Sequence, residues 1–246
     1  MKRSPHPRRR LATLVTGVAV AIGVGTLAVV GLPAAPTAPA PAPAVVAAPR
    51  LVADAPANGC PEVETIAVRG TTERQGGGIV AGPLASALQD QLDQTVRTHD
   101  LVYPASFAYQ QSKRAGVRAL RARLAQTSAE CPGTEFVLIG YSQGADVIGD
   151  TIASGDVPAA DRIGAIAMFG DPAFTSREPF ATGSFRVGTN GIFPRATGAF
   201  GDLTDSVVSF CNRDDNFCQR GSAGTGHFRY GADRQEAVEA VAELLG

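Results

Sequence analysis

The chain has 246 residues, with 22 lysine and arginine side chains against 23 aspartate and glutamate side chains and a formal net charge of −1 at pH 7. Six of the basic residues and none of the acidic ones lie in the first 50 positions, so the rest of the chain carries 16 basic against 23 acidic side chains, a net charge of −7. This negative balance disfavours a nucleic-acid partner, and about 190 residues are enough for one domain with a substantial core.

The N-terminal segment has the composition of a targeting signal. Residues 1–10 are rich in lysine and arginine, and an uncharged run of 22 residues extends from Leu11 to Leu32. This run exceeds the usual signal-peptide core of roughly 7–15 residues and would reach across a bilayer. We therefore expect residues 1–32 to be either a signal peptide or an N-terminal anchor. In the first case the protein is secreted, and in the second it is held at the membrane or cell wall and faces outside.

A proline- and alanine-rich linker is expected at residues 33–57. Residues 33–49 contain six prolines, a composition that favours extended polyproline conformation and a spacer role. The remaining residues, 58–246, are expected to form one folded domain.

Strand and helix patterns alternate along residues 58–246. The predicted strands are Val63–Val68, Leu101–Tyr103, Glu135–Ile139, Ile163–Phe169 and Val207–Phe210. The predicted helices are Leu84–Val96, residues 108–129, a helix that includes residues 147–152, and Arg234–Leu245. Such alternation implies right-handed crossovers and a parallel sheet covered by helices on both faces, so the fold class is α/β. Ligands of such sheets bind beyond the carboxyl ends of the strands, and no stretch is long enough for a separate lid domain.

The loop after the first strand, Arg69-Gly70-Thr71-Thr72-Glu73, lies at that edge of the sheet. Thr71 offers a backbone N–H and a hydroxyl that could both point at a developing oxyanion, and Gly70 permits a close approach. An ordinary turn is the alternative interpretation of this loop.

A strand-to-helix elbow follows the third predicted strand. The sequence Gly140-Tyr141-Ser142-Gln143-Gly144 comes directly after an apolar run and directly before a helical pattern, which makes Ser142 a nucleophile candidate. A serine hydroxyl needs a neighbouring base and a place where oxyanion charge is stabilised. The backbone N–H of Gln143, at the start of the helix, is a candidate for the second role.

The base must be a histidine, and residues 58–246 contain only two. His99 precedes the strand predicted at Leu101–Tyr103 and would lie at the amino-terminal edge of the sheet. His227 follows the last strand and precedes the C-terminal helix, where the order serine, acid, histidine places the base of an α/β-hydrolase. For the acid we favour Asp215, with the adjacent Asp214 and the earlier Asp171 as competitors.

All four cysteines lie in the part of the chain that we expect to be exported. Four cysteines in an oxidising compartment indicate two disulfides, with three possible pairings. The short spacing of Cys211 and Cys218 favours a local bridge around Asp215, which leaves Cys60 and Cys131 for the long one. The spacings form no Cys-x-x-Cys pair, so a zinc site is disfavoured, and the proposed chemistry requires neither metal nor cofactor.

Together these motifs resemble the cutinase family of α/β-hydrolases, in particular its secreted actinobacterial members. The resemblance covers roughly residues 58–246 and implies a lidless catalytic domain with a three-layer fold and a sheet of about five strands. It implies that Ser142 is the nucleophile, Asp215 the acid and His227 the base. The implied oxyanion hole is formed by Thr71 and Gln143, and the implied disulfides join Cys60 to Cys131 and Cys211 to Cys218. The implied activity is that of a serine carboxylesterase that hydrolyses short to medium acyl esters through an acyl-enzyme.

One segment departs from the family pattern. In fungal cutinases the loop before the histidine is apolar and helps to hold the acyl chain, whereas residues 219–226 are polar and glycine-rich here. Cutin is therefore not established as the substrate. Ile192, Phe193 and Pro194 are candidates for the acyl site, with core packing as their alternative role.

Three other functions remain as alternatives. An acyltransferase or phospholipase that acts on cell-envelope lipids would use the same residues. A non-catalytic envelope-binding module would retain the fold without the activated serine, and a serine protease fits an open site less well. We expect a monomer whose partner is an ester, lipid or polyester substrate.

Overall fold

The computed structural model describes residues 59–220 and 224–246 of the protein, and the expected targeting segment and linker lie outside these residues. The described strands are β1 Val63–Val68, β2 Val96–Asp100, β3 Glu135–Tyr141, β4 Ile163–Phe169, β5 Ala181–Thr182 and β6 Val207–Phe210. The described α-helices are α1 Ala81–Gln91, α2 Tyr109–Glu130, α3 Gln143–Ala153 and α4 Arg234–Leu245. None of these helices is long and apolar enough to cross a membrane.

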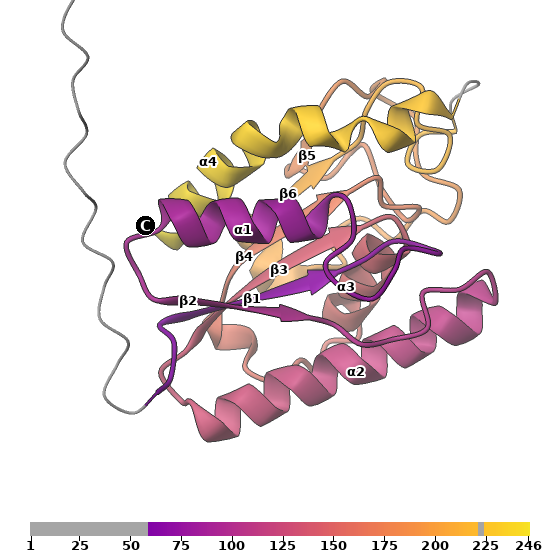
Figure 1. The fold of residues 1–246 in the computed structure, drawn as a ribbon. Coiled ribbons are helices and arrows are strands. Elements are labelled where there is room, and N and C mark those ends of the chain that lie inside the picture. Colours follow the sequence, from indigo (N-terminus) through magenta and orange to yellow (C-terminus); the bar gives the residue numbers. More distant parts are fainter. Residues whose placement is uncertain (1–58, 221–223) are drawn as a thin grey trace, which may run out of the picture. The chain divides into compact units, whose positions relative to one another are not determined.

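The six strands form one parallel sheet in the order β2-β1-β3-β4-β6-β5. Helices α1 and α4 cover one face of the sheet, and α2 and α3 cover the other (Figure 1). The three-layer α/β class predicted from the sequence is confirmed. The sheet has six strands instead of the expected five, because the two-residue β5 pairs with β6 at one edge.

The central strands are apolar on both faces because both faces are covered. Along β3, Val137, Ile139 and Tyr141 pack in the core cluster that contains α1 and α4 residues. The alternating Phe136 and Leu138 pack in the cluster on the α2 and α3 side. Two hydrophobic cores therefore hold β3 from opposite sides and fix the place where it ends.

The edge strand β2 differs from the prediction. Helix α1 ends at Gln91, not near Val96, and Val96–Asp100 is a strand, whereas Leu101–Tyr103 is not. Four of the five residues of β2 are polar. Among them, Arg97 forms an ion pair of 2.7 Å with the buried Glu64 of β1. An edge strand that pairs on one side only tolerates such polar side chains. His99 therefore lies inside β2, opposite Ile66, and not ahead of a strand.

Two disulfides connect the cysteines in the pairing that their spacing favours. Cys60, just before β1, is bonded to Cys131 at the end of α2. Cys211, directly after β6, is bonded to Cys218. The second bridge closes a loop of few residues at the carboxyl end of the sheet, and that loop contains Asp215.

Candidate active site

Ser142 occupies a sharp turn between β3 and α3. Its φ of 53° and ψ of −118° are unusual for a residue with a side chain, and strain of this kind is found mainly at functional sites. The turn requires glycine on either side. A Cβ atom on Gly140 would lie 2.7 Å from the backbone N of Ala145, and one on Gly144 would collide with the carbonyl of Val68. The close backbone packing thus raises the serine above the end of the strand.

His227 lies within hydrogen-bond distance of Ser142. Its Nε2 is 3.0 Å from the Ser142 Oγ, and its Nδ1 is 2.8 Å from Oδ2 of Asp215. The three side chains come from three separate segments, which are the turn after β3, the disulfide loop after β6 and the short 3₁₀ helix Thr225–Phe228. The serine and histidine side chains are mostly buried, and the aspartate is fully buried. The arrangement can move a proton from the hydroxyl to an imidazole that a carboxylate orients.

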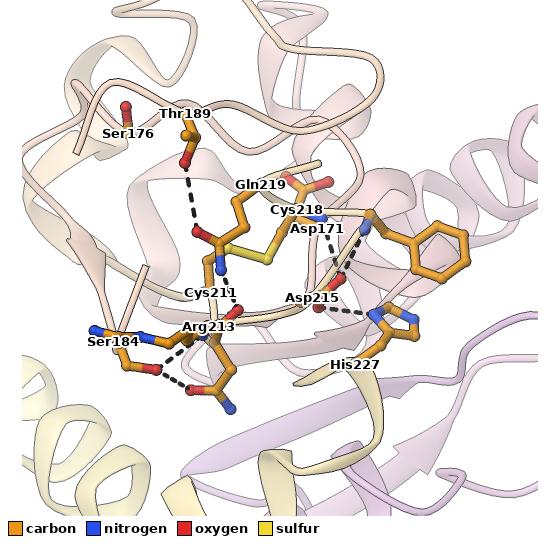
Figure 2. The surroundings of a disulfide bond; sticks show 12 residues. Asp171, Ser176, Ser184, Thr189, Cys211, Arg213, Asp215, Cys218, Gln219 and His227 are labelled. Carbon is orange, nitrogen blue, oxygen red and sulfur yellow. Dashed lines mark hydrogen bonds and ion pairs between the residues drawn. A yellow bond between two sulfur atoms is a disulfide. The ribbon is translucent and has the colours of Figure 1, made fainter. Parts of the chain in front are cut away.

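The disulfide loop presents Asp215 to the histidine. Its Oδ2 also accepts a hydrogen bond of 2.6 Å from the Tyr230 hydroxyl, and its Oδ1 accepts bonds of 2.8 and 3.2 Å from the N–H groups of Phe217 and Cys218. Figure 2 shows the carboxylate between the disulfide and the His227 ring. Burial raises the pKa of Asp215, but the hydrogen bonds from His227, Tyr230 and the Phe217 N–H outweigh it, so the pKa lies below its usual value. The carboxylate is therefore held ionised.

The two competing aspartates have other partners. Asp171 forms an ion pair of 2.9 Å with Arg195 and accepts a hydrogen bond of 2.8 Å from the N–H of Ala173. Asp214 has a φ of 65°, and its backbone carbonyl accepts a hydrogen bond from Gly226. Within the described residues, neither carboxylate forms a hydrogen bond or ion pair with His227. The geometry therefore singles out Asp215.

Thr71 lines the same pocket as Ser142 and His227. Its loop is held by the carboxylate of Glu73, which accepts hydrogen bonds from the backbone N–H of Gly70 and, at 2.7 Å, from that of Ile79. The loop conformation is thus fixed without the threonine itself. Thr71 thus lies in the pocket wall near Ser142, where its N–H and hydroxyl are candidate oxyanion donors.

Gln143 has a fixed side chain that points away from this pocket. Its Oε1 accepts a hydrogen bond of 2.7 Å from the Ser112 hydroxyl, and its Nε2 donates one of 3.2 Å to the carbonyl of Ser106. The side chain therefore ties the start of α3 to the start of α2. Its backbone N–H belongs to the first turn of α3, where N–H groups have no acceptor within the helix.

The pocket in front of Ser142 has a volume of about 510 Å³ and a largely apolar wall. Ile192 and Phe193 are part of that wall, whereas Pro194 is not. The wall is open to solvent: Phe107 is 85% exposed and Phe228 is 71% exposed. Apolar surface thus comes from aromatic side chains around the pocket, although the segment before His227 is polar.

Two sets of contacts were not predicted from the sequence. One is the hydrogen bond from the Tyr230 hydroxyl to Asp215. The other is a buried ionic cluster behind α3, in which Asp146 binds Tyr109 (2.8 Å), Lys113 (3.1 Å) and Arg195 (3.0 Å). The sequence contains one indication of this cluster, which is that Asp146 lies in the first helical turn after Ser142. The cluster connects the helix behind Ser142 with the segment that carries Ile192 and Phe193.

Known proteins resemble this chain in sequence over most of the described residues. The family model "Cutinase" matches residues 59–245. A cutinase of Kineococcus radiotolerans is 36% identical over 188 residues, which cover 71% of this chain and 58% of that protein. The phospholipase Culp4 of Mycobacterium tuberculosis is 32% identical, with 70% of this chain and 73% of the relative covered. The carboxylesterase Culp1 of the same species is 33% identical, with 76% and 82% covered. The chain thus spans less than two thirds of the Kineococcus relative.

Solved structures show the same fold. The catalytic core of an acetyl xylan esterase from Trichoderma reesei has a TM-score of 0.67 at 25% identity and covers 76% of this chain and 100% of its own. A cutinase from the same fungus, in complex with a phosphonate inhibitor, has a TM-score of 0.60 at 24% identity, with 76% and 78% covered.

Proposed function

The chain belongs to the cutinase family of carboxylic ester hydrolases, and we propose that it is a secreted serine esterase that hydrolyses short to medium acyl esters with Ser142, His227 and Asp215 as its triad. The observation that carries this proposal is the pair of contacts at His227, 3.0 Å to the serine Oγ and 2.8 Å to the aspartate Oδ2, at the edge of an apolar pocket.

In the first half of the reaction the Ser142 Oγ attacks the ester carbonyl carbon while Nε2 of His227 takes the hydroxyl proton. The tetrahedral intermediate collapses when the bond to the leaving alkoxide breaks and the imidazolium returns its proton to that oxygen. In the second half, water attacks the acyl-enzyme with the same histidine as base, and the free acid leaves. Asp215, held ionised by its hydrogen bonds, fixes the imidazole tautomer and stabilises the imidazolium.

The oxyanion of both intermediates would be bound by the backbone N–H groups of Thr71 and Gln143. The first belongs to a loop fixed by Glu73, and the second belongs to the first turn of α3, where partial positive charge accumulates. Both donors are held by contacts that do not involve the substrate. They would therefore be in place before the reaction begins.

Export of the catalytic part, residues 58–246, is supported by two features. Its two disulfides are typical of an oxidising compartment. The basic start and long apolar run of residues 1–32, with the proline-rich linker at 33–57, have the composition of a targeting segment and spacer.

The triad assignment is tested by Ser142→Ala. We expect this variant of the full chain to lose turnover of a chromogenic butyrate ester with a nearly unchanged thermal melt, because only one oxygen atom is removed. Ser154→Ala, at the opposite end of α3, is the matched control and should retain activity. Retention of more than a few per cent of the activity by Ser142→Ala would show that another group is the nucleophile.

A phospholipase or acyltransferase is the second candidate, favoured by the exposed aromatic side chains Phe107 and Phe228 beside the pocket. An open apolar rim suits an acyl chain presented by a lipid surface. Product analysis with a long-chain phospholipid and an added alcohol acceptor separates the possibilities. Free acid as the main product indicates hydrolysis, and an excess of the transfer product indicates an acyltransferase.

A further inference from the structure

A second pocket lies on the other side of the disulfide loop from His227. It has a volume of about 470 Å³, and none of its lining residues lines the pocket that contains Ser142. Its lining residues are Ser184, Phe185, Arg186, Thr189, Arg213, Asp214, Gln219 and Arg220. Figure 2 shows Ser184, Arg213 and Gln219 on one side of the Cys211–Cys218 loop and His227 on the other. The hydrolytic chemistry proposed above uses none of these side chains.

This second pocket is positively charged in an otherwise acidic domain. Three arginines and one aspartate line it, whereas residues 58–246 as a whole carry more acidic than basic side chains. Among residues 59–220 and 224–246, the guanidinium groups of Arg186, Arg213 and Arg220 form no ion pair or hydrogen bond. Two partly buried arginines of the domain, Arg123 and Arg195, are by contrast paired with carboxylates. The three free guanidinium groups therefore lack an anionic partner within this part of the protein.

The backbone that carries these arginines is held in place by the loop. The mostly buried Gln219 accepts a hydrogen bond of 2.9 Å from the backbone N–H of Arg186, and its amide group donates to the carbonyl of Asn212. The backbone N–H of Arg213 donates a bond of 2.8 Å to the Ser184 hydroxyl. These contacts fix the spacing between two arginine positions and leave their side chains available to a ligand.

We propose that this pocket binds a phosphate group, carried either by a soluble phosphate ester or by a phospholipid headgroup. The planar guanidinium fork matches the oxygen atoms of phosphate, and a dianion balances the two positive charges that remain after Asp214 is counted. The volume accommodates a phosphate with a small polar group attached. Because the two pockets share no residue, the phosphate binds whether or not an acyl chain occupies the pocket at Ser142.

Calorimetric titration of the full chain tests the proposal. The Ser142→Ala protein is titrated with inorganic phosphate and with glycerol 3-phosphate at constant ionic strength. We expect saturable binding that Arg186→Ala/Arg213→Ala weakens at least tenfold. Arg114→Ala, which removes an exposed arginine on α2, is the control for lost charge and should bind as tightly as its parent. The proposal would be overturned if the double variant and its parent bound phosphate equally well. It would also be overturned if neither protein showed saturable binding of inorganic phosphate or glycerol 3-phosphate.

Vesicles distinguish the two sources of phosphate. The Ser142→Ala protein is sedimented with phosphatidylglycerol vesicles. Co-sedimentation that is lost in the double variant and kept in Arg114→Ala would assign the pocket to a lipid headgroup. Arginine-dependent binding of glycerol 3-phosphate alone would assign it to a soluble ester. If either charge-loss variant unfolds in a thermal melt, Arg186→Gln/Arg213→Gln replaces the double variant and Arg114→Gln its control.

A phosphonate that labels the nucleophile tests whether the two pockets are separate. Phosphate affinity should be unchanged after the wild-type serine is labelled, and its loss would show that phosphate binds at the oxyanion site instead. Failure to label would contradict the proposed nucleophile, whereas the arginine variants test the second pocket independently of it.

Discussion

Tyr230→Phe removes one oxygen atom that supports the candidate catalytic acid. The Tyr230 hydroxyl is buried, donates a hydrogen bond of 2.6 Å to Asp215 and accepts one of 3.1 Å from the N–H of Asn212. A hydrogen bond to a charged group contributes about 1.5–3 kcal/mol to stability. In a domain of this size each kcal/mol changes the melting temperature by about 2–4 °C, so we expect a loss of about 3–12 °C.

The effect has a defined pH dependence. The pKa of Asp215 is held below its usual value because, against the opposing effect of burial, hydrogen bonds from His227, Tyr230 and Phe217 stabilise the charged form. A lowered pKa contributes stability that is present above the unfolded-state pKa of about 3.9 and is lost as the pH falls through the folded-state pKa. The difference in unfolding free energy between wild type and Tyr230→Phe should therefore be largest near neutral pH and decrease in acid.

Urea unfolding at several pH values, combined with a double-mutant cycle, measures this contribution. In the Asp215→Asn background the same tyrosine substitution should cost less, because the charged acceptor is gone. Tyr141→Phe is the matched comparison: its hydroxyl donates at 2.7 Å to the neutral carbonyl of His227, so its removal should cost only about 0.5–1.5 kcal/mol. An equal cost of Tyr230→Phe in both backgrounds, or a melting temperature within 1 °C of wild type, would refute this reasoning.

Other parts of the molecule give three further predictions. Cys211→Ser/Cys218→Ser should lower both esterase activity and melting temperature, since the bridge closes the loop that aims Asp215; unchanged kcat in an ester assay would contradict this. Phe193→Ala should raise KM for octanoate esters more than for acetate esters, as measured in a chain-length series, because the side chain lines the pocket at Ser142 in which we propose that the acyl chain binds. Burial, with the nearby carboxylates of Asp171 and Asp150, raises the pKa of Asp146 to about 6. The folded state therefore binds a proton at Asp146 more tightly than the unfolded state does. The contribution of Asp146 to the unfolding free energy should fall as the pH rises from about 4 to 6. Urea unfolding of Asp146→Asn should lack that component.

The strands that lie in the middle of the sheet were the best predicted from the sequence. Val63–Val68, Ile163–Phe169 and Val207–Phe210 have the bounds that their apolar runs indicate, because helices cover both faces there. The edge strand β2 was missed because its polar side chains are compensated by contacts that are distant in sequence, such as Arg97 with Glu64. The two-residue β5 is too short to leave a pattern.

The candidate site was predictable where a residue has a local motif. The glycines around Ser142 mark the elbow, and chain order alone singles out His227 from His99. The choice between Asp214 and Asp215 depends on which side of the disulfide loop each side chain faces, which the backbone geometry decides and the sequence does not. The role of Tyr230 likewise arises only when the short 3₁₀ helix Tyr230–Asp233 packs against the disulfide loop.

Mass spectrometry of the protein after reaction with a fluorophosphonate probe tests the proposed nucleophile most directly. An activated serine forms a covalent adduct, and peptide mapping should place it on Ser142 of the wild-type chain at neutral pH. Absence of an adduct, as expected for a non-catalytic binding module, or an adduct on a different serine would contradict the proposed mechanism.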